Sequence, residues 1–414
     1  MIHESAKSRT VSNQGSEDAV AEQVKVRGNE IMTNEINRSR FLLSMVTVFF
    51  WSSEYCHVPY FTPYLRELGL TASLIGLLVG TYGFTQMCVR IPLGIGTDIT
   101  GKYKAVVIGG TFFTTISSLG LFLFKNIALL FIFRAFAGVA ASSWIAFTVM
   151  YSSYFTPDEG VKAMARINGF NNTGKLLAFV LGTATATYFG YKAPLLISCI
   201  TGAIAIVLAL FLKDMKVKKT PMKVKDILMI STNRHVICPA LFAAMAMMIA
   251  HATAFSFTSD VARSVGATTT QIGINTSLYT VIQIAAAGFI GSAFIKRQKR
   301  NLICLSGFVL MTIYCLLIGF APNIYIIFLA QLIGGFGYSL VFAILMSACV
   351  EKIEPERKAT AMGLFQAVYG IGMTMGPVCM GQLAQSGGFT GGYTVFAAVS
   401  FATAVLSFLV FAKS

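Results

Sequence analysis

Charged residues are scarce in this chain of 414 residues, and their scarcity argues against a soluble protein. Asp, Glu, Lys and Arg make up 12% of it, whereas a soluble domain carries roughly 25%. Hydrophobic residues make up 55%, so too few polar side chains remain to cover a water-facing surface. The same composition excludes a disordered or collagen-like chain. It indicates a helical protein that crosses a membrane many times.

Other absences narrow the function. The eight cysteines show no paired spacing and lie in or beside apolar stretches, so no disulfide scaffold is indicated. The sequence has no phosphate-binding run of the Gly-x-x-x-x-Gly-Lys-Ser/Thr type, which disfavours an ATP-driven pump. No metal-ligand cluster and no Ser-His-Asp set stands out. We therefore expect no cofactor, no metal and no enzymatic activity, and an ion or substrate gradient as the energy source.

Acidic residues are outnumbered by basic ones, 17 to 32, giving a net charge of +15. A basic protein can bind nucleic acid, but no basic helix with interleaved aromatic residues occurs here. The basic residues instead cluster in short loops between apolar stretches, as in the cytoplasmic loops of membrane proteins. We expect no nucleic-acid partner.

Long apolar stretches are what the sequence does contain. A helix needs about 20 mostly apolar residues to cross a bilayer, and we find twelve such stretches. They lack the period-2 alternation of a β-barrel. The expected spans are 41–64, 72–94, 105–124, 127–152, 163–188, 192–212, 236–259, 270–294, 302–320, 323–348, 360–384 and 392–412.

The basic residues also predict the orientation. An even number of spans puts both termini on one side, where 25 Lys and Arg residues lie, against four on the other side. This asymmetry predicts a multi-pass cell membrane protein with both termini in the cytoplasm. Residues 1–40 are polar and lack the apolar core of a signal peptide, so we expect a disordered cytoplasmic tail.

The chain resembles itself when shifted by 197 residues. Tyr82 then falls on Tyr279, Gln86 on Gln283, Asn126 on Asn323 and Gly138 on Gly335. We therefore expect two pseudo-symmetric six-helix bundles, 41–212 and 236–414, joined by a basic cytoplasmic linker, 213–235. Parallel halves of this kind are typical of transporters that bind substrate near the bilayer midplane and alternate access by rocking.

The loop after the second span carries a recognisable motif. Gly94, Asp98, Gly101, Lys102 and Lys104 follow the cytoplasmic signature of the major facilitator superfamily, with Ile in place of its Arg. The chain resembles a twelve-helix, bacterial-like member of this family of secondary transporters. The resemblance implies that Asp98 faces a helix end or a basic partner across the two halves and latches the cytoplasmic side shut. The alternative is an ordinary solvated turn.

Arg134 and Gly138 in the fourth span resemble the Arg-x-x-x-Gly motif that the family associates with proton coupling. A charge inside the membrane is costly and needs a partner, and Glu54 in the first span is the best candidate. The offset of 197 residues aligns His251 of the second half with Glu54 of the first. We predict that Glu54, Arg134 and His251 take part in proton coupling; a static ion pair is the alternative.

The glycine-rich motif of the family's antiporters is incomplete. The eleventh span contains Gly376 and Pro377, but the fifth span has Ala178 and Phe179 where that pair is expected. This departure weakens assignment as a drug antiporter, and the copy in the eleventh span reads mainly as a close-packing feature.

Lys175, in the middle of the fifth span, has three possible roles. It can pair with Glu54, extend to the membrane surface, or face a cavity and bind an anion. Other polar and aromatic residues of the spans are candidate cavity residues, with ordinary packing as the alternative for each. These are Tyr55, His57, Gln86, Asn171, Asn172, Tyr279, Gln283 and Gln366.

The leading prediction is a proton-coupled transporter in the lipid bilayer, a functional monomer that exports small, partly apolar organic compounds. The alternative is a symporter or exchanger of organic anions, carboxylates or phosphate esters, because Arg134 and Lys175 face one acid, Glu54. A membrane receptor that transports nothing is a remote third possibility, which the duplicated halves disfavour.

Overall fold

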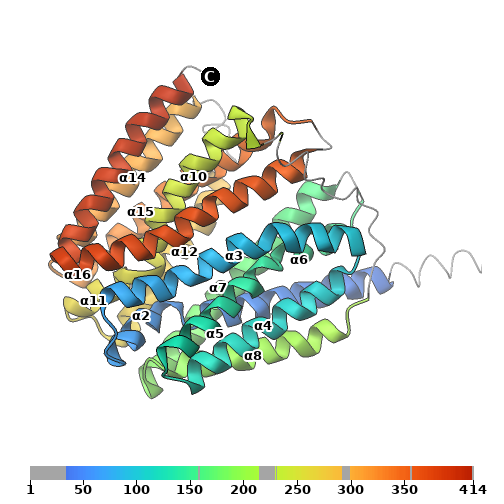
Figure 1. The fold of residues 1–414 in the computed structure, drawn as a ribbon, viewed down its shortest axis with the longest axis horizontal. Helices are drawn as coiled ribbons and strands as arrows, with labels where there is room; N and C mark the ends of the chain where they lie inside the picture. Colours follow the sequence, from blue (N-terminus) through green and yellow to red (C-terminus); the bar gives the residue numbers. More distant parts are fainter. Residues whose placement is uncertain are drawn as a thin grey trace, which may run out of the picture.

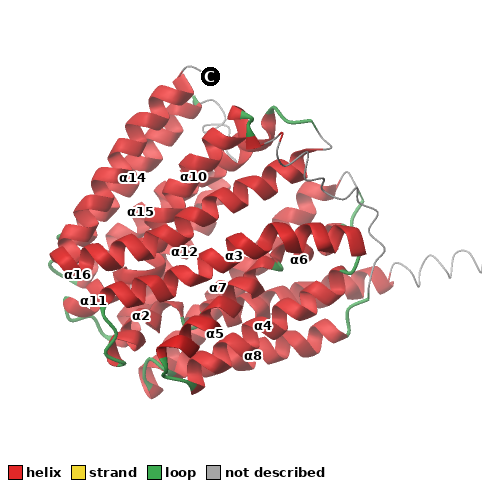
Figure 2. Ribbon diagram, in the orientation of Figure 1, coloured by secondary structure: helices red, strands yellow, loops and turns green. Residues whose placement is uncertain are grey.

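The computed structural model describes residues 34–156, 159–213, 229, 231–290, 299–354 and 357–412. These residues form helices joined by short loops, with no strand among them (Figure 2). The tail up to residue 33 and most of the linker 213–235 lie outside the described residues.

The first helix, 34–55, begins seven residues before the predicted first span. The further helices are α2 (Val58–Glu67), α3 (Ala72–Thr100), α4 (Tyr103–Leu123), α5 (Ile127–Ser142), α6 (Trp144–Ser152), α7 (Gly160–Phe189), α8 (Ala193–Leu210), α10 (Arg234–Ala252), η2 (Thr253–Phe257), α11 (Thr258–Ser264), α12 (Thr269–Ile290), α14 (Arg300–Gly319), α15 (Ile324–Glu351) and α16 (Lys358–Ala412).

Within the part of the chain that the structure describes, eight helical segments are long and apolar enough to cross a membrane by themselves. One of them, α16, contains two crossings, because Gly388 adopts φ 71° and breaks it. Three further crossings among the described helices are made by the first helix together with α2, by the more polar α7, and by α12. Counted across their breaks, the described helices form twelve rods that match the twelve predicted stretches.

Three of the predicted continuous spans are broken. The first turns at Cys56 and His57, where Pro59 in the first turn of α2 has no N–H to continue the helix ladder. The fourth breaks at Ser143, between α5 and α6. The seventh passes through the π-helix η2 between α10 and α11. A π-helical turn inside a long helix is frequent at functional sites.

The two halves repeat the same local structure. Asn126 and Asn323 each accept hydrogen bonds from two backbone amides and start α5 and α15. Gly138 lies against the Tyr82 carbonyl of α3, and Gly335 lies against the Tyr279 carbonyl of α12. The missing side chain allows each pair of helices to cross closely. The sequence repeat is therefore a repeat of helix caps and helix crossings.

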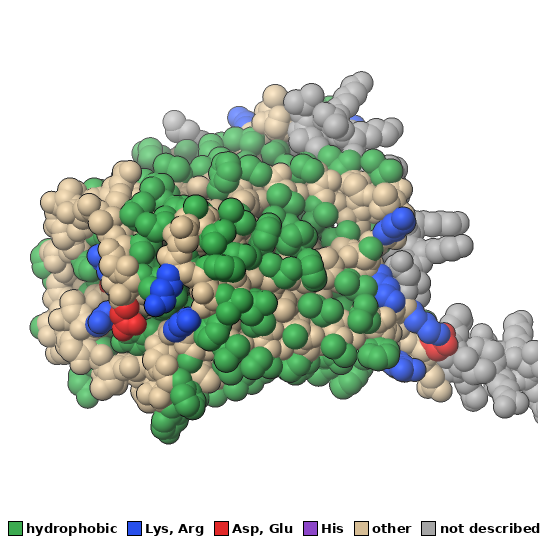
Figure 3. Space-filling model, turned by 60° about the horizontal axis from the view of Figure 1, so that its bottom comes forward, with side chains coloured by type: hydrophobic (Ala, Val, Ile, Leu, Met, Phe, Trp, Pro, Cys, Tyr) green, Lys and Arg blue, Asp and Glu red, His purple; other side chains and the backbone are tan. Residues whose placement is uncertain are grey.

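The helices form two bundles that meet along α3 and α16. The bundles lie together at the lower left of Figure 1 and diverge toward its upper right. We call the side where the first helix begins and α16 finishes the terminal end, and the other side the opposite end. Apolar side chains cover the flank of the molecule in Figure 3, while Lys, Arg, Asp and Glu gather near its two ends. This is the surface expected of a membrane-spanning protein.

Candidate functional site

A polar cluster lies inside the first bundle around Glu54. Glu54 and His57 are 3% and 2% exposed, and Arg134 is 6% exposed. His57 lies between Ser198 Oγ, 3.1 Å from Nδ1, and Arg134, 3.3 Å from Nε2. The neighbouring Ser53 hydroxyl contacts Thr114 and donates to the Ser198 carbonyl. His57 is thus a hydrogen-bonded residue of the bundle interior, held by α5 and α8.

The expected ion pair between Arg134 and Glu54 is not formed. No Arg134 nitrogen lies within 4 Å of the Glu54 carboxylate, and neither carboxylate oxygen has a hydrogen-bond partner. The Arg134 guanidinium instead lies 5.0 Å from the ring centre of Phe61 and 4.8 Å from that of Tyr82. The prediction of a direct pair is wrong for this conformation, because aromatic faces and His57 surround the guanidinium.

Lys175 projects from the middle of α7 toward the first helix. Gly174 brings α7 close to that helix, with 3.1 Å between the position of an added Cβ and Trp51 Cβ. The Lys175 ammonium then lies 5.3 Å from the ring centre of Trp51 and 4.8 Å from that of Tyr55. It forms no ion pair with Glu54 or with any other acid of the described residues.

The second bundle meets this region through aromatic rings. The Phe255 ring, in η2, lies 6.1 Å from Tyr55 and 5.3 Å from His251. On its other side it contacts Tyr279 of α12, at 5.5 Å. His251 is half-buried and lies within electrostatic range of Arg134 and Lys175. The structure thus brings Tyr55, Lys175, His251 and Tyr279 into one region between the bundles.

The remaining predicted residues lie at different depths. Gln86 and Asn171 are 5% and 7% exposed, and Tyr279 is fully buried. Asn172, Gln283 and Gln366 are half-buried. The side-chain oxygen of Asn171 and the side-chain nitrogen of Gln283 have no hydrogen-bond partner. Of these residues, Gln366 has a hydrogen-bond partner in the other bundle.

That partner is Arg90 of α3, which the sequence prediction missed. Arg90 Nη1 donates to Gln366 Oε1 at 3.0 Å and to Tyr369 Oη at 3.1 Å, and Nη2 donates to the Ala141 carbonyl at 3.2 Å. Arg90 is 5% exposed and has no acidic partner among the described residues. The signal was present in the sequence, because Arg90 is a charge inside a predicted span, like Arg134 and Lys175.

The motif from Gly94 to Lys104, at the terminal end, makes the contacts that the structure describes within the first bundle. Gly101 ends α3 with φ 65°, and the Tyr103 hydroxyl donates to Asp98 at 2.6 Å. Lys102 precedes α4, and Lys104 donates to the Leu210 carbonyl of α8. Gly94 packs on Ile145. The expected contact of Asp98 with the other half is absent among the described residues, because the two bundles diverge at this end.

Contacts between the bundles gather at the opposite end. The Arg66 side chain of α2 lies 3.7 Å from Asp260 of α11. The Thr62 hydroxyl donates to the Ser256 carbonyl at 3.1 Å, and the Tyr60 hydroxyl donates to the Thr269 carbonyl at 3.1 Å. The structure is therefore closed at the opposite end and parted at the terminal end.

The family follows from the match along the whole membrane-spanning region. A family model of the Major Facilitator Superfamily matches residues 43–259 and 237–414. The chain belongs to the major facilitator superfamily. It is a secondary transporter of small molecules and a multi-pass integral membrane protein, not an enzyme. Among the described residues, no group of three or more His, Cys, Asp or Glu side chains is arranged to hold a metal.

Several relatives are transporters. An uncharacterized MFS-type transporter of Methanocaldococcus jannaschii is 26% identical over 364 residues, covering 85% of this chain and 92% of that protein. The oxalate:formate antiporter of Oxalobacter formigenes is 33% identical over 157 residues, 36% of each chain. A proton-coupled antiporter flippase, LtaA of Staphylococcus haemolyticus, is 26% identical over 152 residues, 34% of this chain and 38% of that one.

Solved structures support the fold. The crystal structure of the nucleoside transporter NupG has a TM-score of 0.74 at 16% identity, covering 92% of this chain and 99% of that one. A bacterial homolog of the human lysosomal transporter Spinster, solved inward-facing and unoccupied, has a TM-score of 0.69 at 14% identity, covering 92% and 96%. At these identities the likeness establishes the fold alone.

Proposed function

We propose that this transporter carries a small organic anion, a carboxylate or phosphate ester, by exchange or together with a proton. The observation that carries the proposal is an excess of buried positive charge. Lys175, Arg90 and Arg134 lie in the interior of the spans or between the bundles, and none forms an ion pair with the described acids. Glu54 is the acid within electrostatic range of Arg134. A cation without a counter-ion in the membrane interior is costly, and an anionic substrate supplies the missing charge.

Lys175 is the residue that we propose contacts the substrate. It is half-buried, and its known contacts are the ring faces of Trp51 and Tyr55. Ring faces stabilise the ammonium but do not neutralise it, so its charge and an N–H donor remain available to a ligand. The same rings favour a substrate with an apolar or planar body beside its anionic group. The printed name of the Oxalobacter formigenes relative, an oxalate:formate antiporter, agrees with this substrate class.

The test compares Lys175→Met with Lys175→Arg. Purified protein is titrated with a carboxylate series and with a series of lipophilic cations, and binding is followed as thermal stabilisation. We expect Lys175→Met to weaken carboxylate binding about tenfold or more, since a hydrogen bond to a charged group is lost. Lys175→Arg retains the charge and should retain part of the binding. Equal carboxylate binding by wild type and Lys175→Met would contradict the proposal.

The second candidate is proton-coupled efflux of partly apolar compounds. Its support is Glu54, whose carboxylate oxygens are buried without a hydrogen-bond partner, an arrangement suited to a group that gains and loses a proton. The proton-coupled LtaA relative agrees with it. In this case Lys175→Met would spare or strengthen the binding of lipophilic cations, because a repelling charge is gone.

With the termini in the cytoplasm, as we propose from the basic residues, this structure faces inward.

A further inference from the structure

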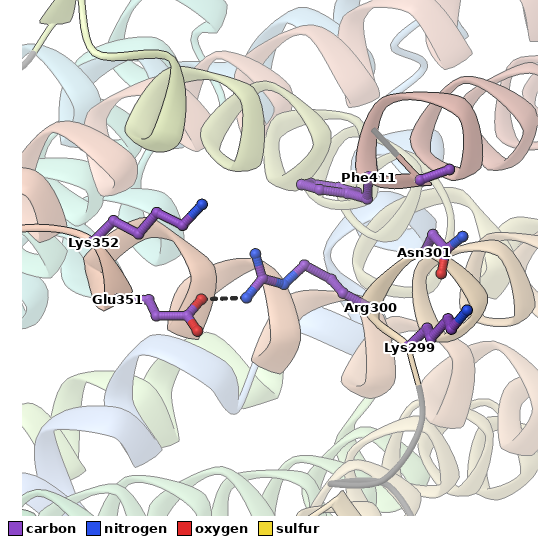
Figure 4. A pocket seen from close by; sticks show the side chains of 7 residues that line it. Lys299, Arg300, Asn301, Glu351, Lys352 and Phe411 are labelled. Atoms are coloured by element: carbon purple, nitrogen blue, oxygen red, sulfur yellow. Dashed lines mark hydrogen bonds and ion pairs between the residues drawn. The ribbon is translucent and has the colours of Figure 1, made fainter. Parts of the chain in front are cut away.

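A cavity of about 480 Å³ lies at the terminal end of the second bundle. The start of α14, the end of α15 and the end of α16 border it, and Figure 4 shows their side chains around it. These helix ends mark the level at which membrane spans meet water and lipid headgroups. The cavity is lined mainly by Lys299, Arg300, Asn301, Glu351, Lys352 and Phe411.

The lining carries an excess of positive charge. Arg300 forms an ion pair with Glu351, drawn as the dashed line in Figure 4. Lys299 and Lys352 form no ion pair with the described acids. The cavity therefore presents two free ammonium groups and a paired guanidinium, which suits a phosphate better than a neutral ligand.

The helix that starts at the cavity adds to this preference. Lys299 is the N-cap of α14, and its side chain makes no capping hydrogen bond. The first amides of a helix and its dipole favour an anion at this position. The start of α14 adds to the attraction of an anion, while the cavity and its cations form the site.

The other border of the cavity is apolar. Phe411 packs on Phe242, with 5.5 Å between ring centres. Along α16, Leu409 and Leu406 are 52% and 55% exposed, and Leu302 of α14 is 43% exposed. Leu302, Leu406 and Leu409 thus present apolar surface to the membrane near the cavity, the two leucines of α16 on the face away from Phe411. A free phosphate would use only the basic side, whereas a phospholipid uses both.

We propose that this cavity binds the phosphate group of an anionic phospholipid. Lys299 and Lys352, which lie on opposite sides of the cavity in Figure 4, attract the phosphate, and an acyl chain lies along the exposed leucines of α16. Basic pockets between membrane helices recognise anionic headgroups by this combination of charge and apolar surface. The site lies within the second bundle and does not depend on which substrate the transporter carries.

The first experiment removes the two free charges together. Full-length protein in a neutral detergent is titrated with phosphatidylglycerol, phosphatidylcholine or inorganic phosphate, and bound lipid is counted by native mass spectrometry. We expect Lys299→Gln/Lys352→Gln to bind phosphatidylglycerol roughly thirtyfold more weakly, since each basic residue contributes about a factor of five. Lys162→Gln/Arg166→Gln, which removes two charges from the first bundle at the same end, is the control and should bind like wild type.

The second experiment changes affinity in the opposite direction. Glu351→Gln removes the acid of the cavity and frees Arg300, so phosphatidylglycerol should bind about fivefold more tightly. This variant keeps the proposal testable if the double variant does not fold. Added salt should weaken binding in wild type, because charges near the surface are screened.

Three results would overturn the proposal. Equal losses in the control and the double variant would mean that lipid binds a diffuse basic surface. Phosphatidylcholine binding as tightly as phosphatidylglycerol would show that the headgroup charge is not recognised. Displacement of phosphatidylglycerol by equimolar inorganic phosphate would identify free phosphate as the ligand.

Discussion

Buried charges of opposite sign stay apart in the first bundle, and this separation suits a transport cycle. Arg134 is surrounded by Phe61, Tyr82 and His57, while the Glu54 carboxylate lacks a hydrogen-bond partner. An ion pair of both residues would hold Glu54 ionised. Without it, the proton exchange that we propose for Glu54 does not require an ion pair to break, and the arginine stays charged.

The carboxylate of Glu54 is the first group to test for coupling. Glu54→Gln should abolish accumulation driven by a pH difference and leave exchange of substrate across the membrane, because only the proton step is lost. The measurement is uptake into proteoliposomes with and without a pH gradient. Glu159→Gln is the control, because the hydrogen bond from Lys162 lowers the pKa of Glu159, which therefore stays ionised near neutral pH. Gradient-driven accumulation by Glu54→Gln would assign the proton to another group, with His251 the next candidate.

Arg90 shows where residue-level prediction fails. The sequence places it inside a span, but its partners Gln366 and Tyr369 lie more than 270 residues away in the other bundle. Which side chains meet there depends on the rotation of α3 against α16, which local sequence does not encode. The same limit explains why a direct contact of Arg134 with Glu54 was wrongly expected.

At the scale of elements, the sequence repeat predicts more than the number of helices. The offset of 197 residues pairs Asn126 with Asn323 and Gly138 with Gly335, and the structure uses each pair for the same cap or crossing. These are local features, decided by residues a few positions apart or by one helix face. The breaks at Cys56–His57, at Ser143 and at η2 were missed, because length and average hydrophobicity define a span but do not show where its helix turns.

The crossing at Gly138 can be tested with one methyl group. An added Cβ at Gly138 would lie 3.0 Å from the Gln86 backbone nitrogen and even closer to the Tyr82 carbonyl. Gly138→Ala should therefore force α3 and α5 apart and lower the free energy of unfolding by about 1–3 kcal/mol.

A matched change on α4 separates packing from helix propensity. Gly109→Ala meets nothing within 4 Å, so it should leave stability unchanged or raise it by up to about 1 kcal/mol. Both variants are compared by thermal unfolding in the same detergent. Equal melting temperatures for Gly138→Ala and Gly109→Ala would mean that the two helices tolerate separation.

At the scale of the whole molecule, the sequence predicts two rocking halves but not the conformation in which they rest. That choice depends on a difference of a few kcal/mol between two packings of the same bundles. In this structure α3 and α16 stay together from the opposite end up to Arg90. Asp98 then contacts Tyr103 within its own half, so the predicted contact with the other half is not part of this conformation.

The ion pair of Arg66 and Asp260 is a contact that this conformation has and the alternative must break. Arg66, in the first bundle, lies 3.7 Å from Asp260 and 5.6 Å from the ring centre of Phe389, both in the second. The Asp260 side chain is 5% exposed, so without Arg66 it would be a buried acid lacking its partner, which disfavours closure at the opposite end.

Arg66→Gln should therefore shift the protein toward the conformation open at the opposite end. A partly exposed ion pair is worth up to about 1 kcal/mol, which corresponds to a population change of up to about fivefold. The readout is the rate at which a membrane-impermeant maleimide modifies a cysteine introduced at Ser256, a position that is 1% exposed in the closed arrangement. Lys125→Gln, which removes an exposed cation at the same end, should leave the rate unchanged. If Arg66→Gln also leaves it unchanged, then the hydrogen bonds of Thr62 and Tyr60, rather than the ion pair, hold this end closed.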